Sequence, residues 1–223
     1  MTELHGRLAA AEMLCGSGDT VIDVGCDHGY LPLSLLEKGR FLIAVLTDVN
    51  EKPLESARRN FADSAMADRA EFVLGDGLCG VRADGEYVIC VCGMGGELIS
   101  RILEEGFETA KGAKRLVLQP MSRPEALRRY LTRSGFEILG ETAVSEEDKL
   151  YLIFEAVFCG EKREISEIDA LLGTKAPEGE REAYFKRLLD AYTVIKNGKR
   201  SAGHDVSAEE IIIDEIMRRT SRE

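Results

Sequence analysis

The residues with the clearest chemical potential lie within one short segment, residues 23–32, which reads DVGCDHGYLP. It combines two carboxylates, an imidazole and a phenol with two glycines. These residues are Asp23, Gly25, Asp27, His28, Gly29 and Tyr30. Two later apolar runs also end in acids, Asp48 and Asp76. Because the carboxyl ends of parallel strands meet at one edge of a sheet, we expect these acids to lie close together.

The acids discriminate between two classes of nucleotide-like ligand. A dinucleotide-binding loop would need glycine at positions 25, 27 and 30, but Asp27 and Tyr30 stand at the last two. A carboxylate near a pyrophosphate costs a few kcal/mol at about 4 Å in a partly shielded site, which disfavours NAD and FAD. S-adenosyl-L-methionine has no phosphate, and its sulfonium and ammonium cations suit acidic surroundings.

Two of the acids have specific expected roles towards S-adenosyl-L-methionine. Asp48 follows Gly25 by 23 residues, the position from which a carboxylate can accept hydrogen bonds from both ribose hydroxyls. Asp76, between Gly75 and Gly77, is placed to meet the adenine amino group. Structural alternatives stay open at this stage. The two glycines of the first loop could simply form a tight turn, and Asp48 could cap the following helix.

A further glycine-rich segment, Gly93-Met94-Gly95-Gly96, follows another apolar run at the same predicted edge. It is either a plain strand-to-helix turn or part of the wall of a substrate cleft. His28 is likewise either a hydrogen-bonded loop residue or a catalytic group. The residues alone do not separate these alternatives.

The hydrophobic pattern predicts the elements that position these loops. Short apolar runs, at 20–24, 41–46, 71–74, 87–92 and 115–118, alternate with helical patterns at 31–38, 51–65, 97–105 and 124–134. Runs that are apolar throughout indicate strands buried on both faces of a parallel sheet. Residues 136–144 and 150–158 predict an antiparallel hairpin. We therefore expect an α/β, Rossmann-like sheet that is mostly parallel and ends in an antiparallel hairpin.

The last part of the chain has a different pattern. Residues 180–196 predict an amphipathic helix, Asn197-Gly198 predicts its end, and Ser207 with Glu210 has the spacing of a capping box. We expect two antiparallel helices, in a helical C-terminal extension at 161–223 beside a cofactor-binding domain at 1–160.

Composition excludes several classes of protein. Hydrophobic residues make up 44% of the 223 residues, which excludes disorder as the main state, and no apolar run has the length of a membrane span. The polar N-terminus leads us to expect a cytoplasmic protein. Six cysteines and three histidines show no zinc spacing, so we expect no metal. Cys90 and Cys92 are expected to pack as small hydrophobic residues on one strand face.

The net charge of −11 argues against nucleic-acid binding by bulk positive charge. Residues 161–223 carry 12 basic and 14 acidic residues, so most of the excess lies in the first domain. Local basic patches, which could equally be solvated helix faces, are Arg123, Arg128, Arg129, Arg133, Lys196, Lys199 and Arg200.

Taken together and in this order, the motifs resemble the bacterial tRNA adenine-22 N1-methyltransferase family. The resemblance covers about residues 4–158. The motifs that carry it are Asp23-x-Gly25-x-Asp27-His28-Gly29-Tyr30-Leu31-Pro32, Asp48, Gly75-Asp76-Gly77-Leu78, Gly93-Met94-Gly95-Gly96 and Leu118-Gln119-Pro120. One position departs from the pattern, because Met121 stands where the family usually has Asn. Met packs against a base edge but cannot hydrogen-bond to it. The Asx-Pro-Pro-aromatic motif of exocyclic amino methyltransferases is absent, in agreement with a ring nitrogen as target.

The resemblance implies methyl transfer from S-adenosyl-L-methionine to N1 of one adenine in tRNA. The expected cofactor-binding residues are Asp23, Gly25, Asp27, Gly29, Asp48, Asp76, Gly77 and Gly93. The expected substrate-binding residues are Met94, Gly95, Gly96, Gln119 and Pro120. Asp27, His28 and Tyr30 are the catalytic candidates. The alternatives are a methyltransferase acting on a small molecule or protein, and a noncatalytic RNA-binding protein of the same fold. The sequence gives no indication of oligomeric state.

Overall fold

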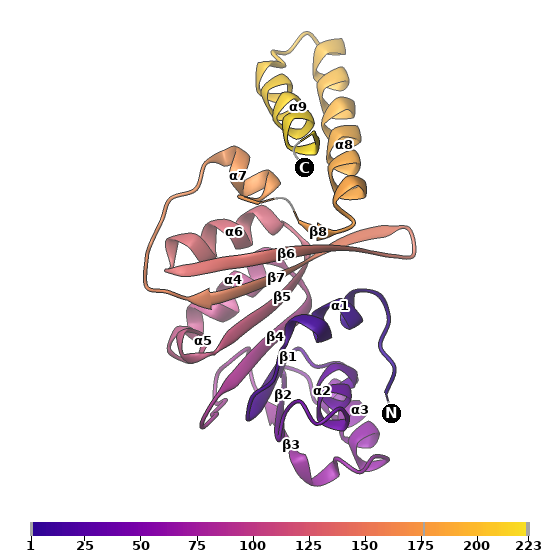
Figure 1. Ribbon diagram of the computed structural model, residues 1–223, viewed down its shortest axis with the longest axis vertical. Coiled ribbons are helices and arrows are strands. Elements are labelled where there is room, and N and C mark those ends of the chain that lie inside the picture. The colour runs from indigo at the N-terminus through magenta and orange to yellow at the C-terminus, as the bar shows by residue number, and fades with distance from the viewer. Residues whose placement is uncertain (1, 176, 222–223) are drawn as a thin grey trace.

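The computed structural model describes residues 2–175 and 177–221. Its centre is an eight-stranded sheet in the order β3-β2-β1-β4-β5-β7-β6-β8 (Figure 1). The strands are β1 (Thr20–Val24), β2 (Ile43–Asp48), β3 (Ala70–Leu74), β4 (Tyr87–Gly95), β5 (Arg115–Ser122), β6 (Phe136–Glu146), β7 (Lys149–Phe158) and β8 (Glu178–Gly179). The predicted mostly parallel sheet with an antiparallel hairpin is confirmed.

The direction in which successive strands are added to the sheet reverses at β1. β1 pairs in parallel with both β2 and β4, and β4 pairs in parallel with β5. The chain thus builds outwards from β1 in one direction to β3 and then restarts at β4 on the other side. Such a switch point leaves a crevice at the carboxyl ends of the two central strands, where ligands of α/β sheets bind.

Helices cover both faces of the sheet. They are α1 (Gly6–Leu14), α2 (Tyr30–Glu37), α3 (Glu51–Ala62), the short 3-10 helix η1 (Ala67–Arg69), α4 (Gly96–Glu105), α5 (Phe107–Gly112) and α6 (Pro124–Arg133). Alternate residues of one strand face opposite layers. Val21 packs with residues of α1, α2 and α3, whereas Ile22 packs with residues of α4 and α6. This two-sided burial explains why the strands read as apolar throughout.

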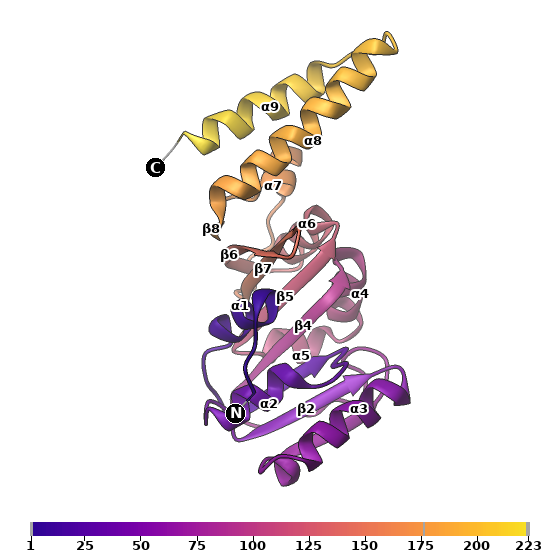
Figure 2. The same ribbon diagram turned by 90° about the vertical axis from the view of Figure 1, so that its right-hand side faces the viewer.

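The last elements are α7 (Glu167–Leu172), α8 (Arg181–Ser201) and α9 (Ser207–Thr220). α8 and α9 form an antiparallel helical hairpin that projects away from the sheet (Figure 2). Only its base is buried with the main core, through Tyr184, Phe185 and Ile216. The division of the chain at residue 160 stays a prediction, but the core continues across it.

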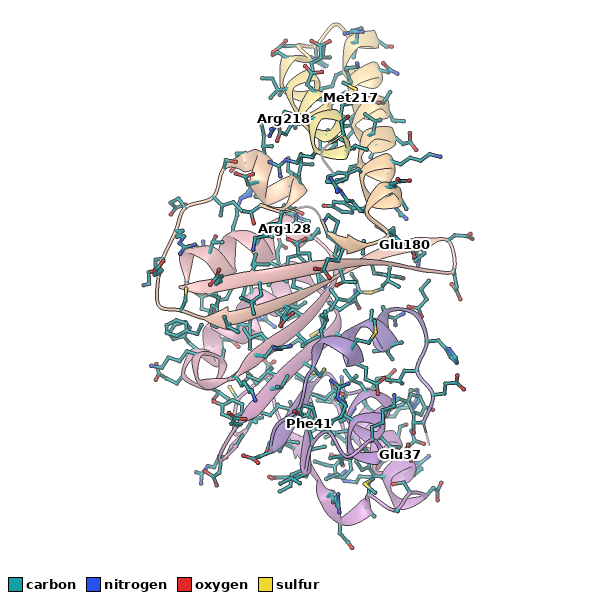
Figure 3. All side chains as sticks on the ribbon, in the orientation of Figure 1. Glu37, Phe41, Arg128, Glu180, Met217 and Arg218 are labelled. Carbon is teal, nitrogen blue, oxygen red and sulfur yellow. The ribbon has the colours of Figure 1, made fainter. Side chains whose placement is uncertain are left out.

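A buried ion pair lies beneath this hairpin. Arg128 of α6 is completely buried (Figure 3). Its Nε and Nη2 atoms donate to the two carboxylate oxygens of Glu141 at 2.8 and 2.5 Å. Its Nη1 donates to the carbonyl oxygens of Ala170 and Leu171, and Nη2 also contacts the hydroxyl of Tyr184. The expectation that Arg128 belongs to an exposed basic patch is wrong, because all its donors serve the fold.

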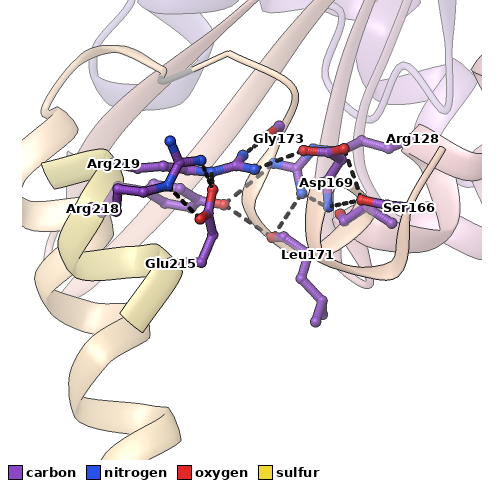
Figure 4. Close-up of polar contacts among 10 residues, drawn as sticks. Arg128, Ser166, Asp169, Leu171, Gly173, Glu215, Arg218 and Arg219 are labelled. Carbon is purple, nitrogen blue, oxygen red and sulfur yellow. Dashed lines mark hydrogen bonds and ion pairs between the residues drawn. The ribbon is translucent and has the colours of Figure 1, made fainter. Parts of the chain in front are cut away.

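A second polar cluster fastens α9 to α7 (Figure 4). The Arg219 guanidinium donates to Asp169 at 2.7 Å, to Glu215 at 2.6 Å and to the carbonyl oxygen of Gly173. Ser166 caps α7 by accepting a hydrogen bond from the Asp169 amide. These contacts join α7, and the Gly173 turn that ends it, to the last part of α9.

Two local predictions in this region are wrong. α8 continues through Asn197-Gly198 to Ser201, because its last turn ion-pairs with α9: Lys199 with Glu209 and Arg200 with Glu210. Those contacts offset the roughly 1 kcal/mol cost of an interior glycine. α9 does begin at Ser207, but no capping box forms there. The Ser207 hydroxyl and amide both donate to Asp205 instead.

Candidate functional site

A cavity of about 370 Å³ opens at the carboxyl ends of β1 and β4. We call it the Asp23 cavity. It brings together most of the chemically active residues predicted from the sequence. These are Asp23, Gly25, Asp27, His28, Tyr30, Asp48, Gly93 and Met94. Segments that lie far apart in the chain, from Asp23 to Met94, therefore meet at the predicted crevice.

A second cavity of about 330 Å³, the Asp76 cavity, adjoins the first. Gly25, Asp48 and Met94 line both cavities, and Asp76 and Gly77 line only the second. The Met94 side chain marks the boundary, because a Cβ atom on Gly25 would lie 2.1 Å from the Met94 methyl carbon. A ligand that spans both cavities must displace this flexible thioether and can then lie directly on the Gly25 backbone. The joined shape suits an elongated molecule that crosses Asp48 near its middle.

The first loop adopts left-handed backbone conformations at Gly25 (φ +72°) and Asp27 (φ +46°). The Gly25 amide donates to the carbonyl oxygen of Thr47 at 2.8 Å, which fixes the loop against β2. Gly29 precedes α2 and lines neither cavity. A Cβ atom there would meet the Leu46 side chain at 2.7 Å, so close packing accounts for this glycine.

Asp48 ends β2 but does not cap the next helix. The N-cap of α3 is Asn50, whose backbone amide donates to the Oδ1 atom of Asp48 at 2.8 Å. The capping alternative is therefore wrong. The Nδ2 atom of Asn50 donates to the same oxygen at 3.4 Å. Both bonds go to Oδ1, so the carboxylate is oriented and its second oxygen is left for the cavities that it lines.

Asp23 provides a buried carboxylate at the base of the first cavity. Its side chain makes no hydrogen bond or ion pair within residues 2–175 and 177–221. Burial, with smaller contributions from Asp27 and Asp48, raises its pKa from 3.8 to about 7. Three carboxylates around one cavity with little positive charge create a site for a cationic group.

The two cysteines that line this cavity are poor nucleophiles. Burial, followed by the charge of Asp23 and Asp48, raises the pKa of Cys26 to about 12. Burial beside Asp23 also raises the pKa of Cys92 well above its usual value. Both thiols are therefore protonated at neutral pH, and only the thiolate is strongly nucleophilic. Cys90 is fully buried on the same face, as expected.

The three catalytic candidates lie at the mouth of the Asp23 cavity. The His28 Nε2 atom is 3.6 Å from the Asp27 carboxylate, and the rings of His28 and Tyr30 stack at 5.4 Å. All three side chains are exposed. They can therefore reach a substrate that enters from solvent.

The glycine-rich segment forms the opposite wall. Gly93 and Met94 line the cavity at the end of β4, whereas Gly95 and Gly96 lead into α4. A Cβ atom on Gly96 would lie 2.2 Å from the Arg123 carbonyl oxygen, so this junction requires glycine. Gln119 is completely buried and accepts a hydrogen bond from the Gly93 amide at 3.0 Å. In this structure Gln119 holds the Gly93 loop, and Pro120 lines a different cavity next to α8.

No motif or spacing predicted that α1 belongs to the site. Arg7 and Leu8 line the Asp23 cavity from this helix. The Arg7 Nη1 atom donates to Glu146 at 2.7 Å, while its Nε is buried without a partner among the described residues. The further residues that line the Asp76 cavity are Val24, Thr47, Val49, Leu98, Arg101 and Ile102. Apolar residues of this kind carry no sequence signal that separates a cavity wall from core.

Within the described parts of the chain, no group of three or more His, Cys, Asp or Glu side chains is placed to hold a metal ion. None of the described helices combines the length and the apolar character needed to cross a membrane.

A family model described as a methyltransferase domain matches residues 4–154. The tRNA (adenine(22)-N(1))-methyltransferase of Bacillus subtilis is 29% identical over 154 residues, which cover 69% of this chain and 65% of that protein. The match therefore spans less than two thirds of that relative.

Two solved structures resemble the chain over almost its whole length. Streptococcus pneumoniae Sp1610 in complex with S-adenosyl-L-methionine is 28% identical, with a TM-score of 0.82, and the match covers 94% of this chain and 97% of that one. A Streptococcus agalactiae protein of the NADB-Rossmann superfamily is 26% identical, with a TM-score of 0.83, and the match covers 97% and 96%.

Proposed function

The chain belongs to the methyltransferase family whose domain model matches residues 4–154, and we propose that it methylates N1 of adenine 22 in tRNA with S-adenosyl-L-methionine. The observation that carries this proposal is the pair of joined cavities, with acids along their length and Asp48 at their junction. The likeness to Sp1610, which binds S-adenosyl-L-methionine, supports the choice of cofactor. A tRNA substrate also implies the cytoplasm as the place of action.

The residues present fit the chemistry of this cofactor. Asp23 is a buried carboxylate without a cationic partner in the described chain, which suits an ammonium group. Asp48 has one oxygen in a loop hydrogen bond and one left for ribose hydroxyls. Asp76, in the second cavity, suits the adenine amino group. Gly25 leaves the backbone open where a side chain would block the passage between the cavities.

The reaction makes modest demands on the protein. When bound, S-adenosyl-L-methionine supplies an electrophilic methyl group on a positively charged sulfur. N1 of neutral adenine already carries a free lone pair, so no base has to remove a proton before attack. The main work of the chain is to hold the base in line with the methyl group, and good positioning contributes roughly 7–11 kcal/mol to barrier reduction.

The mouth of the Asp23 cavity supplies the groups for that positioning. His28 and Tyr30 present stacked rings beside Asp27. We assign the rings to contact with the target base and Asp27 to a hydrogen bond with its amino group. That amino group becomes more acidic after methylation, so the same carboxylate can accept a proton from it. A base-paired adenine must first leave its pair, at a cost of a few kcal/mol.

A methyltransferase acting on a protein or small molecule is the second candidate. The net charge of −11 favours it. In addition, several predicted basic residues are neutralised, since Arg129 pairs with Glu167 and Arg123 contacts Glu97 and Glu125. RNA contacts would therefore have to come from a few other cations.

Nucleoside mass spectrometry separates these candidates. Incubation of the protein with labelled S-adenosyl-L-methionine and unmodified tRNA should yield 1-methyladenosine. A transcript with guanine at position 22 should give none, because N1 of guanine bears a proton at neutral pH. Label on an exocyclic nitrogen, on another nucleoside or on no RNA at all would contradict the proposal.

A further inference from the structure

A third cavity, of about 220 Å³, lies between the sheet and the helical hairpin. We call it the Tyr184 cavity. Its walls come from the segment that ends β5 (Pro120 and Met121), from the start of β7 (Tyr151) and from α8 (Tyr184, Arg187 and Leu188). No single part of the chain makes this cavity, because the sheet supplies one side and the C-terminal helix supplies the other.

Two sets of contacts connect this cavity with the Asp23 cavity. The Arg7 guanidinium, which lines the Asp23 cavity, lies 5.4 Å from the centre of the Tyr151 ring, which lines the Tyr184 cavity. On the other side, Gln119 accepts from the Gly93 amide at 3.0 Å, and its Nε2 is 3.6 Å from the Met121 sulfur. The walls of the two cavities therefore touch directly at Arg7 and Tyr151, and Gln119 bridges them at the second point.

The walls combine apolar surface with positive charge on the rim. Pro120, Met121 and Leu188 provide apolar surface, and Tyr151 and Tyr184 provide rings. Arg187 is exposed and makes no ion pair or hydrogen bond through its side chain within the described residues. Arg7 has an unpartnered, buried Nε on the side of the Asp23 cavity. Because the Arg7 guanidinium is ion-paired with Glu146, Arg187 is the cation available at this slot. Apolar walls with that cation on the rim complement a flat base attached to an anionic phosphate.

The size of the slot supports a single base. Cavities that hold drug-sized ligands usually measure about 300–1,000 Å³, so 220 Å³ suits a fragment such as one ring system. Met121 lines the slot, and a thioether packs against a base without reading its edge. Contact of this kind tolerates different bases.

We propose that the Tyr184 cavity receives an unpaired tRNA base next to the target adenine, while Arg187 contacts the adjoining phosphate. This inference rests on the proposed function and names how the RNA is held at that same site. It gives α8 a direct part in substrate binding. It also explains how an acidic protein can engage RNA, since the contact relies on one pocket and the cation on its rim, Arg187.

Matched substitutions on α8 test the proposal. Ala191→Phe fills the cavity from its exposed wall, and Ala183→Phe adds the same ring at an exposed position outside it. Arg187→Gln removes the rim charge, and Lys186→Gln removes an exposed neighbouring charge that does not line the cavity. Calorimetry with S-adenosyl-L-methionine should give the wild-type affinity for all four variants, which shows that the cofactor site is intact.

Steady-state methylation of tRNA should then separate the pairs. Ala191→Phe should raise the KM for tRNA by about 10- to 100-fold, the size expected for loss of one stacked base, while Ala183→Phe should leave it unchanged. Arg187→Gln should reduce the slope of log affinity against log salt by about 1, and Lys186→Gln should reduce it less. In the wild type, an abasic nucleotide on one side of the target should raise KM similarly, and it should have little further effect in Ala191→Phe.

Formation of 1-methyladenosine by the wild type tests the proposed function separately. Its absence would overturn both the proposed function and the role of the Tyr184 cavity. If the wild type is active but Ala191→Phe and Ala183→Phe have equal KM values, the proposed function stands and this inference falls. Additive effects of Ala191→Phe and the abasic nucleotide would also overturn it, because two changes to one contact cannot add fully. Such outcomes would leave the cavity to another occupant, such as a peptide.

Discussion

Charged side chains are arranged in opposite ways in two regions of this molecule. Beneath the helical hairpin, Arg128 and Glu141 are both buried and fully paired. At the carboxyl edge of the sheet, Asp23 is equally buried, but its nearest charged neighbours are other acids, Asp27 and Asp48. The first arrangement satisfies its charges within the chain. The second lacks positive charge, which a ligand can supply. Whether buried charges are paired within the chain therefore distinguishes the scaffold from the site.

The largest expected effect comes from breaking the paired region. Arg128→Ala should lower the free energy of unfolding by about 3–5 kcal/mol, because Glu141 stays buried without a partner. The double variant Arg128→Met with Glu141→Leu should recover much of this loss. Chemical denaturation measures both values. Equal stability of Arg128→Ala and the wild type would show that the pair contributes nothing to the fold.

Removing the charge of Asp23 in the unpaired region should have the opposite effect and raise the free energy of unfolding. The pKa of Asp23 is raised from 3.8 to about 7 in the folded protein. The folded state therefore holds this proton more tightly than the unfolded chain. The associated stability is fully present below about pH 4 and is lost as the pH rises through about 7. Asp23→Asn carries no charge to bury, so it should raise the free energy of unfolding at pH 8 by about 2–4 kcal/mol.

The same variant should be unchanged in stability near pH 4, where the wild-type carboxyl is also neutral. It should nevertheless bind S-adenosyl-L-methionine more weakly, because the amide cannot pair with an ammonium group. Chemical denaturation at pH 4 and pH 8 measures the two free energies of unfolding, and calorimetry measures the affinity for S-adenosyl-L-methionine. A variant that is less stable at pH 8 would show that Asp23 supports the fold, contrary to its assignment to the ligand.

Asp48 sharpens the comparison because it serves the ligand through hydrogen bonds. Asp48→Ala should weaken cofactor binding by about 10- to 100-fold, since charge-assisted hydrogen bonds contribute about 1.5–3 kcal/mol. Its stability should change little, because the loop loses only two exposed hydrogen bonds, from the backbone amide and the side-chain Nδ2 of Asn50. Asp63→Ala, an exposed acid at the end of α3, is the matched control. Unchanged cofactor affinity in Asp48→Ala would remove Asp48 from the ribose site.

The smallest effect is expected at the second paired cluster. Arg219 contacts Asp169 and Glu215 in a partly exposed setting, where ion pairs contribute about 0–1 kcal/mol. Arg219→Gln should therefore lower the free energy of unfolding by about 1 kcal/mol, with cofactor affinity unaffected. Arg218→Gln, whose partner Glu215 is shared, should cost less. If Arg219→Gln lowered the free energy of unfolding as much as Arg128→Ala does, burial would not determine how much these ion pairs stabilise the fold.

The sequence predicted most of the sheet because local pattern determines it. Strands buried on both faces are apolar throughout, and the acids after β1, β2 and β3 lie at the edge where parallel strands end. The site residues that were missed depend on tertiary placement. Arg7 reaches the cavity only because α1 packs near β5, β6 and β7, far along the chain. No spacing within α1 carries that information.

The two wrong predictions near the C-terminus have the same origin. Asn-Gly favours a turn locally, but ion pairs between α8 and α9 keep the helix intact past Gly198. Ser207 has good capping spacing, but Asp205 takes its hydroxyl hydrogen bond. The wrong assignment of Arg128 follows the same logic, because a row of arginines on a helix does not reveal which one faces Glu141.

The projecting hairpin should unfold locally in steps, from its far end towards its base. Its base contributes Tyr184, Phe185 and Ile216 to the main core, whereas Val194, Ile195 and Ile211, further along, remain exposed. Amide hydrogens near the far end, around residues 196–210, can therefore exchange with solvent after local fraying of the adjoining helix ends. Those around Tyr184 can exchange only when the core itself opens. One continuous helix, α8, should thus contain both fast-exchanging and slow-exchanging amides, and binding of RNA against its base would extend the slow part outwards.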